Sequence, residues 1–292
     1  TGDGLADLLL TSWAGSVNMY PGIAGEPRRF GDGVRLMQVT GDPSEDPYYL
    51  AHTAGEWTGG DVGDLDGDGI TDLAVGAPQD DDGGSDRGAV WILFLDSVGS
   101  VQGLQKISSL AGNFLGELSD NDRFGAAIAS IGDLDGDAIA DLAVGAPEDS
   151  DGGTGKGAVW ILFMNNDGSV KSQQKISAER GGFEGNLDSN DRFGSALAGI
   201  GDLDANGVND LAVGASGDDD GGTDRGAVWI LFLNADGTVD TEQKISHSEG
   251  KFNGDLGDGD AFGSALADIG DLDGDGITDL AVGAPGSDDG GT

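Results

Sequence analysis

The chain contains no cysteine and only two histidines, His52 and His247. Without cysteine it has neither a disulfide framework nor thiolate chemistry. A zinc site is not expected, because zinc in proteins is usually held by cysteine and histidine. No apolar run reaches the length of a membrane-spanning helix, so we expect no insertion into a membrane.

Basic residues are also scarce. The 292 residues include 14 Lys+Arg against 54 Asp+Glu, which gives a formal net charge of -40. Nucleic acids and anionic membranes attract positive surfaces, so neither is an expected partner. The same charge destabilises a compact chain by self-repulsion unless cations are bound. The chain does not resemble a disordered acidic protein, however, because 37% of it is hydrophobic and it contains dense apolar runs such as Ala89–Leu95.

A nine-residue acidic segment recurs along the chain. It begins Asp64-Leu-Asp66-Gly-Asp68 and returns at residues 133, 202 and 271, so the period is 69 residues. A fixed period of this length is typical of propellers and of repeat arrays. Because the acidic segment recurs with the repeating unit, we expect it to help every unit fold, which favours metal binding over catalysis.

The third repeat shows the expected unit of structure. The pattern of small and apolar residues predicts the first two strands at 193–200 and 210–215. A continuous apolar run predicts a third strand, buried on both faces, at 227–233. A hairpin turn at 234–237 precedes a short outer strand at 242–246. Four short strands without helical periodicity predict an all-β fold with β-propeller-type blades of four antiparallel strands.

The repeats divide the chain into two parts. Residues 58–292 form tandem 69-residue repeats, of which the last is truncated. Residues 1–57 form a divergent partial repeat, with strand patterns at 5–10 and 15–20. Because the sequence starts and stops inside a repeat, we expect it to be a piece of a longer protein.

The acidic segment has the features of a calcium-binding hairpin loop. Carboxylates at positions one, three, five and nine, with the main-chain carbonyl of position seven, supply the hard oxygens that Ca²⁺ prefers, whereas Mg²⁺ demands a stricter octahedron. Glycines at positions four and six permit the tight turn. The predicted ligands are Asp64, Asp66, Asp68, Ile70 and Asp72; Asp133, Asp135, Asp137, Ile139 and Asp141; Asp202, Asp204, Asn206, Val208 and Asp210; and Asp271, Asp273, Asp275, Ile277 and Asp279.

The loops are not equivalent. Ala138 replaces the glycine of position six, and Ala205 replaces that of position four. Because a β-carbon resists the backbone conformations that such a turn needs, we predict weaker calcium binding at these two loops.

Other acids also recur, at residues 80–82 and 218–220 and again at 120–122, 188–191 and 258–260. Solvated loop charge is the favoured interpretation of these patches. Secondary cation sites or bridging contacts between neighbouring units are the alternative.

Three tryptophans, Trp91, Trp160 and Trp229, occupy equivalent places in the apolar runs. Apolar neighbours on both sides favour packing between blades over the stacking of a sugar or another ligand.

The motifs that flank the acidic loop resemble the FG-GAP repeat of the integrin α-subunit propeller and its bacterial relatives. The FG pairs are Phe124-Gly125, Phe193-Gly194 and Phe262-Gly263, and the GAP triplets are Gly76-Ala-Pro78, Gly145-Ala-Pro147 and Gly283-Ala-Pro285, with Gly214-Ala-Ser216 departing at its last residue. Residues 1–57 resemble the looser VCBS-type bacterial repeats. The resemblance implies a β-propeller with calcium loops on one face, in a secreted or cell-surface protein, but it indicates no ligand.

These observations lead to one functional hypothesis and two alternatives. The leading hypothesis is a calcium-stabilised extracellular structural or adhesive module, whose partners are other proteins or copies of itself in a surface array or filament. A lectin-like propeller that binds glycans through Tyr48, Tyr49 or Trp57 is the first alternative, and an accessory domain of a secreted enzyme is the second. The chain shows no nucleophile–histidine–acid set, so we expect no enzymatic activity of its own.

Overall fold

The computed structural model describes residues 8–12, 16–20, 34–35 and 59–288. Strands and turns make up this part of the protein. Within these ranges, no helix has the length and apolar character needed to cross a membrane.

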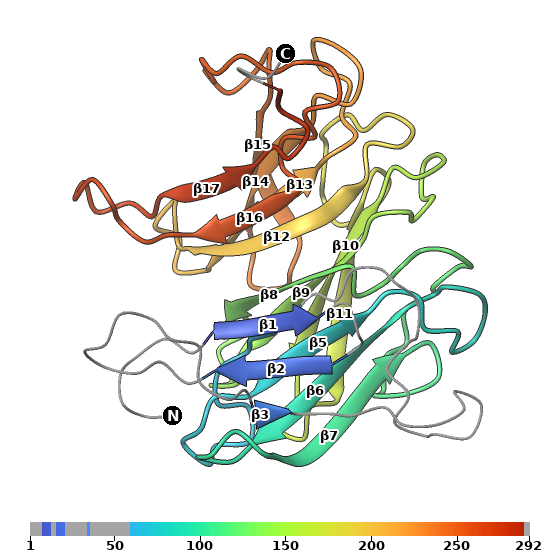
Figure 1. Cartoon of the computed structure of the whole chain (residues 1–292), viewed down its shortest axis with the longest axis vertical. Helices are drawn as coiled ribbons and strands as arrows, with labels where there is room; N and C mark the ends of the chain where they lie inside the picture. Colours follow the sequence, from blue (N-terminus) through green and yellow to red (C-terminus); the bar gives the residue numbers. More distant parts are fainter. Residues whose placement is uncertain (1–7, 13–15, 21–33, 36–58, 289–292) are drawn as a thin grey trace.

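Three four-stranded antiparallel sheets follow one another along the chain (Figure 1). The first sheet contains β4 (Gly59–Asp61), β5 (Leu73–Ala77), β6 (Ala89–Leu95) and β7 (Val101–Ser108); the second contains β8 (Ala127–Gly132), β9 (Asp141–Ala146), β10 (Ala158–Met164) and β11 (Val170–Ser177); and the third contains β12 (Phe193–Gly201), β13 (Asp210–Ala215), β14 (Ala227–Leu233) and β15 (Val239–Ile245). Within each sheet, neighbours in sequence are neighbours in space. The predicted all-β fold with four-stranded blades is confirmed.

Two smaller sheets complete the described part. The strands β16 (Ala265–Asp268) and β17 (Leu280–Gly283) form an antiparallel pair, and β1 (Leu8–Ser12), β2 (Ser16–Tyr20) and β3 (Val34–Arg35) form a three-stranded sheet. In the third repeat the predicted outer strand was placed too late: β15 begins at Val239 because the residues after the hairpin turn already pair with β14.

The sheets are arranged as neighbouring propeller blades. The first strand of each sheet packs beside the first strand of the next, so β4 contacts β8, β8 contacts β12, and β12 contacts β16. Figure 1 shows the same succession from cyan to red. This arrangement places the turn after each first strand at an equivalent position in every blade.

The hydrophobic core lies between neighbouring blades. Trp160 of β10 belongs to the same cluster as Ile92 of the preceding blade, and Trp229 shares a cluster with Ile161. The segment that connects two blades adds an aromatic ring, since Phe183 packs edge-on against Trp229 with centroids 5.0 Å apart. The predicted packing between blades is therefore confirmed for Trp160 and Trp229, whereas the cluster that contains Trp91 is made of residues of its own blade.

The FG and GAP motifs meet where two blades join. The N–H of Phe193 donates to the carbonyl of Lys156 in the preceding blade at 2.9 Å. Gly194 has a φ of 91°, which disfavours any side chain, and a β-carbon on Gly145 would overlap the carbonyl oxygen of Gly194. Both motifs need glycine because two main chains touch there.

We predict that Gly145→Ala destabilises the protein by about 1–3 kcal/mol, because the added methyl group forces two backbones apart in a packed junction. The matched control is Gly60→Ala in β4, where a β-carbon would lie at an ordinary 3.9 Å from its nearest neighbour, the carbonyl oxygen of Ile128. Denaturant midpoints with an unchanged m-value would measure the difference. Equal midpoints for the two variants would contradict the proposed reason for the glycine.

Candidate metal loops

Each acidic loop is the turn between the first two strands of a blade. The loops at 64–72, 133–141, 202–210 and 271–279 follow β4, β8, β12 and β16 in turn. The predicted ligand residues lie in these turns, except that Asp141 and Asp210 are the first residues of β9 and β13. The two flanking strands fix both ends of each loop.

Three carboxylates converge in each loop. Ligand oxygens of positions one, three and nine lie within 4.8 Å of one another; the groups are Asp64, Asp66 and Asp72; Asp133, Asp135 and Asp141; Asp202, Asp204 and Asp210; and Asp271, Asp273 and Asp279. The predicted ligands of position five, Asp68, Asp137, Asn206 and Asp275, are outside these groups. The carbonyls of position seven stay predictions.

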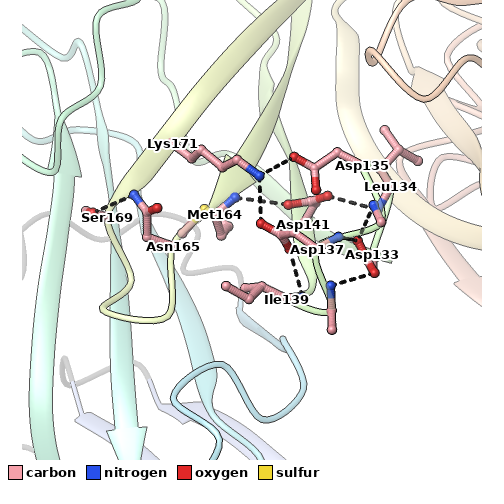
Figure 2. A network of polar contacts seen from close by, with 12 residues as sticks. Asp133, Leu134, Asp135, Asp137, Ile139, Asp141, Met164, Asn165, Ser169 and Lys171 are labelled. Atoms are coloured by element: carbon pink, nitrogen blue, oxygen red, sulfur yellow. Dashed lines mark hydrogen bonds and ion pairs between the residues drawn. The ribbon is translucent and has the colours of Figure 1, made fainter.

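The aspartate of position nine anchors the loop to the blade. Asp141 is 1% exposed, and its carboxylate accepts from the N–H of Leu134 in the loop and of Met164 at the end of β10, both at 2.9 Å (Figure 2). Burial raises the pKa of Asp141 to about 6. Asp72 and Asp210 make the same two contacts, and burial raises their pKa in the same direction.

The remaining carboxylates shape the turn. Asp133 accepts from the N–H groups of Gly136 at 2.7 Å and Ala138 at 2.8 Å, and Asp137 accepts from Ile139 at 2.9 Å through Oδ1. The loop at 271–279 repeats this pattern with Asp271 and Asp275. The turn is thus preformed by its own side chains.

Both alanine substitutions fall where the backbone is left-handed. Ala138 has a φ of 72° and Ala205 a φ of 61°. Residues with a β-carbon pay about 1 kcal/mol or more for this conformation relative to glycine. The positive φ angles show the backbone strain from which we predict weaker calcium binding at these two loops. The weaker binding itself stays a prediction.

The donor set of the loops fits a hard cation. Several acids meet at close range with few basic partners, and oxygen is the ligand type that Ca²⁺ takes. In one loop a cation from the chain itself is present: Nζ of Lys171 lies 2.7 Å from both Asp135 and Asp137. The hydrogen bonds that its ammonium donates to these two carboxylates raise the pKa of Lys171.

The interpretation of the other acidic patches as solvated charge is wrong for several of their members. Asp218 is 2% exposed because Nζ of Lys244 lies 2.7 Å from it and also 2.7 Å from Asp220. The same ammonium lies over the ring of Trp229, 5.3 Å from its centroid. Lys175 makes the equivalent contacts with Asp149, Asp151 and Trp160, and Lys106 with Asp80, Asp82 and Trp91.

Sequence reasoning missed these lysines, although a signal existed. Gln-Lys-Ile-Ser recurs in register at residues 105, 174 and 243. Each lysine lies 26 positions after the first acid of a recurring pair, at Asp80, Asp149 and Asp218. A lysine that recurs at a constant separation from recurring acids indicates an ion pair within each repeat. Bridging contacts between units also occur: Arg87 pairs with Asp120, and Arg225 with Asp258, each at 2.9 Å.

A second buried acid adjoins two of these clusters, those of Lys175 and Lys244. Asp191 is 2% exposed, and its Oδ1 has no hydrogen-bond partner. Burial raises its pKa to about 7, and the neighbouring Asp218 adds to the effect. The equivalent Asp122 also has its pKa raised to about 7, again mainly by burial.

Comparison with known proteins agrees with the geometry. The sequence matches the family described as FG-GAP repeat over residues 57–93, 124–162, 193–231 and 262–292, which together make up half of the chain. It is 34% identical over 234 residues to integrin alpha-PS2 of Drosophila melanogaster, covering 78% of this chain and 15% of that protein. It is 37% identical over 167 residues to integrin alpha-2 of Mus musculus, covering 56% of this chain and 13% of that protein.

A third relative is integrin alpha pat-2 of Caenorhabditis briggsae, which is 30% identical over 240 residues. That match covers 76% of this chain and 17% of the relative. The chain therefore spans less than a fifth of the length of each of these three relatives.

The buried acids predict an unusual pH dependence of stability in the absence of divalent ions. Between about pH 4 and 7 the folded protein keeps protons on Asp122 and Asp191 that the unfolded chain has released. Stability then falls as the pH rises through this window. We expect the melting temperature in excess chelator to be higher at pH 5 than at pH 8.

The variant Asp191→Asn mimics the protonated acid, so it should raise the melting temperature at pH 8 and change it little at pH 5. Asp255→Asn is the matched control, because Asp255 is exposed, is not among the groups that shift the pKa of Asp191, and gives an equal change in net charge. A similar rise in both variants at pH 8 would assign the effect to overall charge instead of burial.

Proposed function

Because the chain belongs to the FG-GAP repeat family, we propose that it is a calcium-stabilised structural or adhesive module of an extracellular protein. The observation that carries the proposal is the convergence of three carboxylates in the same turn of four successive repeats. One acidic turn is common in proteins. Three converging carboxylates in each of four repeats, with the acids of positions one and nine accepting from the same main-chain N–H groups of the loop, favour a shared ligand.

Calcium is the proposed ion because of the donors and their setting. In the loop at 64–72, Asp64, Asp66 and Asp72 contribute the converging oxygens, and we propose that Asp68 and the carbonyl of Ile70 complete the shell. The other loops supply the equivalent residues. A flexible set of carboxylate and carbonyl oxygens suits Ca²⁺ better than the strict octahedron of Mg²⁺.

An ion in these loops would stabilise the fold in two ways. It would neutralise acids that burial and mutual repulsion otherwise disfavour, and it would reduce the repulsion that follows from a net charge of -40. Because the unfolded chain lacks the preformed turn, binding to the folded state alone would raise stability by mass action.

The adhesive part of the proposal rests on the relatives, whose printed names are integrin alpha subunits. We propose that the partners are other proteins, including copies of this chain, and that the module acts outside the cell. Sedimentation with calcium and with chelator tests self-association directly. A mass that stays that of one chain under both conditions would rule out the assembly of copies.

A sugar-binding function has less support. Trp91, Trp160 and Trp229 are at most 7% exposed, and a lysine covers each ring, so none presents a face for stacking. A hollow of about 600 Å³ adjoins Trp160, but charged side chains such as Glu117 and Lys175 line it. Tyr48, Tyr49 and Trp57, on which the lectin-like alternative depends, lie outside the described residues.

We predict that excess chelator lowers the melting temperature by about 10 °C or more relative to saturating calcium. A ligand at about 100 times its dissociation constant adds about 2.7 kcal/mol per site, and several loops contribute. Differential scanning calorimetry measures the shift, and an unchanged melting curve would refute calcium stabilisation.

The variant Asp204→Asn should reduce the calcium-induced rise in melting temperature, because it removes one converging carboxylate while keeping an acceptor oxygen for the N–H of Asn206. Asp188→Asn, outside the loops, is the control with the same change in charge and should keep the full rise. If both variants lose the same amount, calcium acts on the overall charge of the protein and not at the loop.

A further inference from the structure

The fourth strand of each complete blade carries one extra residue near its start. In β11, Val170 pairs with Met164 and Ser172 pairs with Phe163, so Lys171 is the unpaired residue of a β-bulge. Gln102 of β7 and Asp240 of β15 occupy the same bulge position. Bulges redirect a side chain out of the regular pleat. The N–H of Met164, opposite the bulge, donates to Asp141 of the loop, which ties the bulge to the loop.

Lys171 uses this position to reach into the loop at 133–141. Figure 2 shows its ammonium bridging Asp135 and Asp137, with Nζ 2.7 Å from Oδ2 of each. Oδ1 of Asp137 is engaged in shaping the turn through the N–H of Ile139. The lysine therefore binds Oδ2 of Asp137, the oxygen that does not shape the turn. A metal ion bound in the loop would need the same oxygen as a ligand.

Among the described residues, no lysine or arginine forms an ion pair with the carboxylates of the other three loops. Gln102 donates instead to Oδ2 of Asp96 at 3.0 Å, so it is directed to the neighbouring turn. The third loop has a carboxylate, Asp240, at the bulge position, and a neutral Asn206 in place of the acid at position five. Lysine at the bulge thus distinguishes the loop at 133–141 from its counterparts.

An ammonium and a calcium ion compete for the same oxygens. The bridging lysine reduces the repulsion between Asp135 and Asp137, which is one of the effects expected from a metal ion. A metal would have to displace it and leave the lysine near a divalent cation, which is unfavourable. The side chain is attached to the blade, so its effective concentration at the loop is high and does not depend on the medium.

We propose that Lys171 is an internal counter-ion that holds the loop at 133–141 without calcium, whereas the loops at 64–72, 202–210 and 271–279 require the ion. This inference rests on the proposed calcium function, because it concerns which loops take the ion. The proposed role of Lys171 also differs from the effect of Ala138. A strained turn weakens calcium binding, but it supplies no positive charge in place of the calcium ion.

The test is amide hydrogen exchange of the full chain, measured by peptide with excess chelator and with saturating calcium. In the unaltered protein we expect calcium to slow exchange in 64–72 by about tenfold or more, and in 133–141 by less than about twofold. In Lys171→Gln, which installs the residue of the first blade, the loop at 133–141 should become as responsive as 64–72.

Three further variants address charge, generality and backbone strain. Lys156→Gln makes the same change in charge in the segment between β9 and β10, at the opposite end of β9 from the loop, and it should behave as the unaltered protein does. The reverse exchange, Gln102→Lys, should make the loop at 64–72 unresponsive to calcium. Ala138→Gly should leave 133–141 unresponsive, because the lysine remains.

The possible failures are distinguishable. If 133–141 responds to calcium in the unaltered protein as strongly as 64–72, or if Ala138→Gly restores the response, Lys171 is not the counter-ion. The same conclusion follows if Lys171→Gln leaves 133–141 unresponsive while the other loops respond. If no loop responds in any variant, the proposed calcium function fails, and the present inference fails with it.

Discussion

Mutual repulsion among carboxylates is the constraint on which this structure depends. Each blade brings three acids to within a few ångströms at one turn, and the backbone around them is organised to keep them there. The aspartate of position nine has the central role: Asp141 joins its own loop to the end of β10 through two main-chain N–H groups. Buried acceptors of this kind hold the turn in place even though the charges oppose it.

The repeating part of the fold could be predicted closely from the sequence. The strands at 210–215 and 227–233 match β13 and β14 residue for residue, because a buried central strand produces a continuous apolar run bounded by turns. The outer strand β15 was harder to predict, because Val239–Ile245 is mostly polar and its start depends on pairing with β14. Acids and glycines at a fixed spacing also located the candidate loops.

The side-chain partners of the acids could not be predicted in the same way. An aspartate in an acidic glycine-rich segment gives no sign of burial, yet Asp218 is covered by Lys244 from a strand that follows in the chain. The lysine faces the acid because the pairing of β14 with β15 puts Lys244 opposite Trp229. Similarly, Lys171 reaches Asp135 only because a bulge turns it toward the loop. Such pairings depend on register, which a single sequence does not specify across a loop.

The glycine contacts at the blade junctions have a consequence for the array as a whole. Because Gly145 of one repeat meets Gly194 of the next without any intervening side chain, the stability of each unit is linked to that of its neighbour by main-chain geometry. Repeat proteins built this way behave as one-dimensional chains with nearest-neighbour coupling. Partial unfolding should then spread from a weakened unit to adjacent ones, so that the cooperative unit is larger than a single 69-residue period.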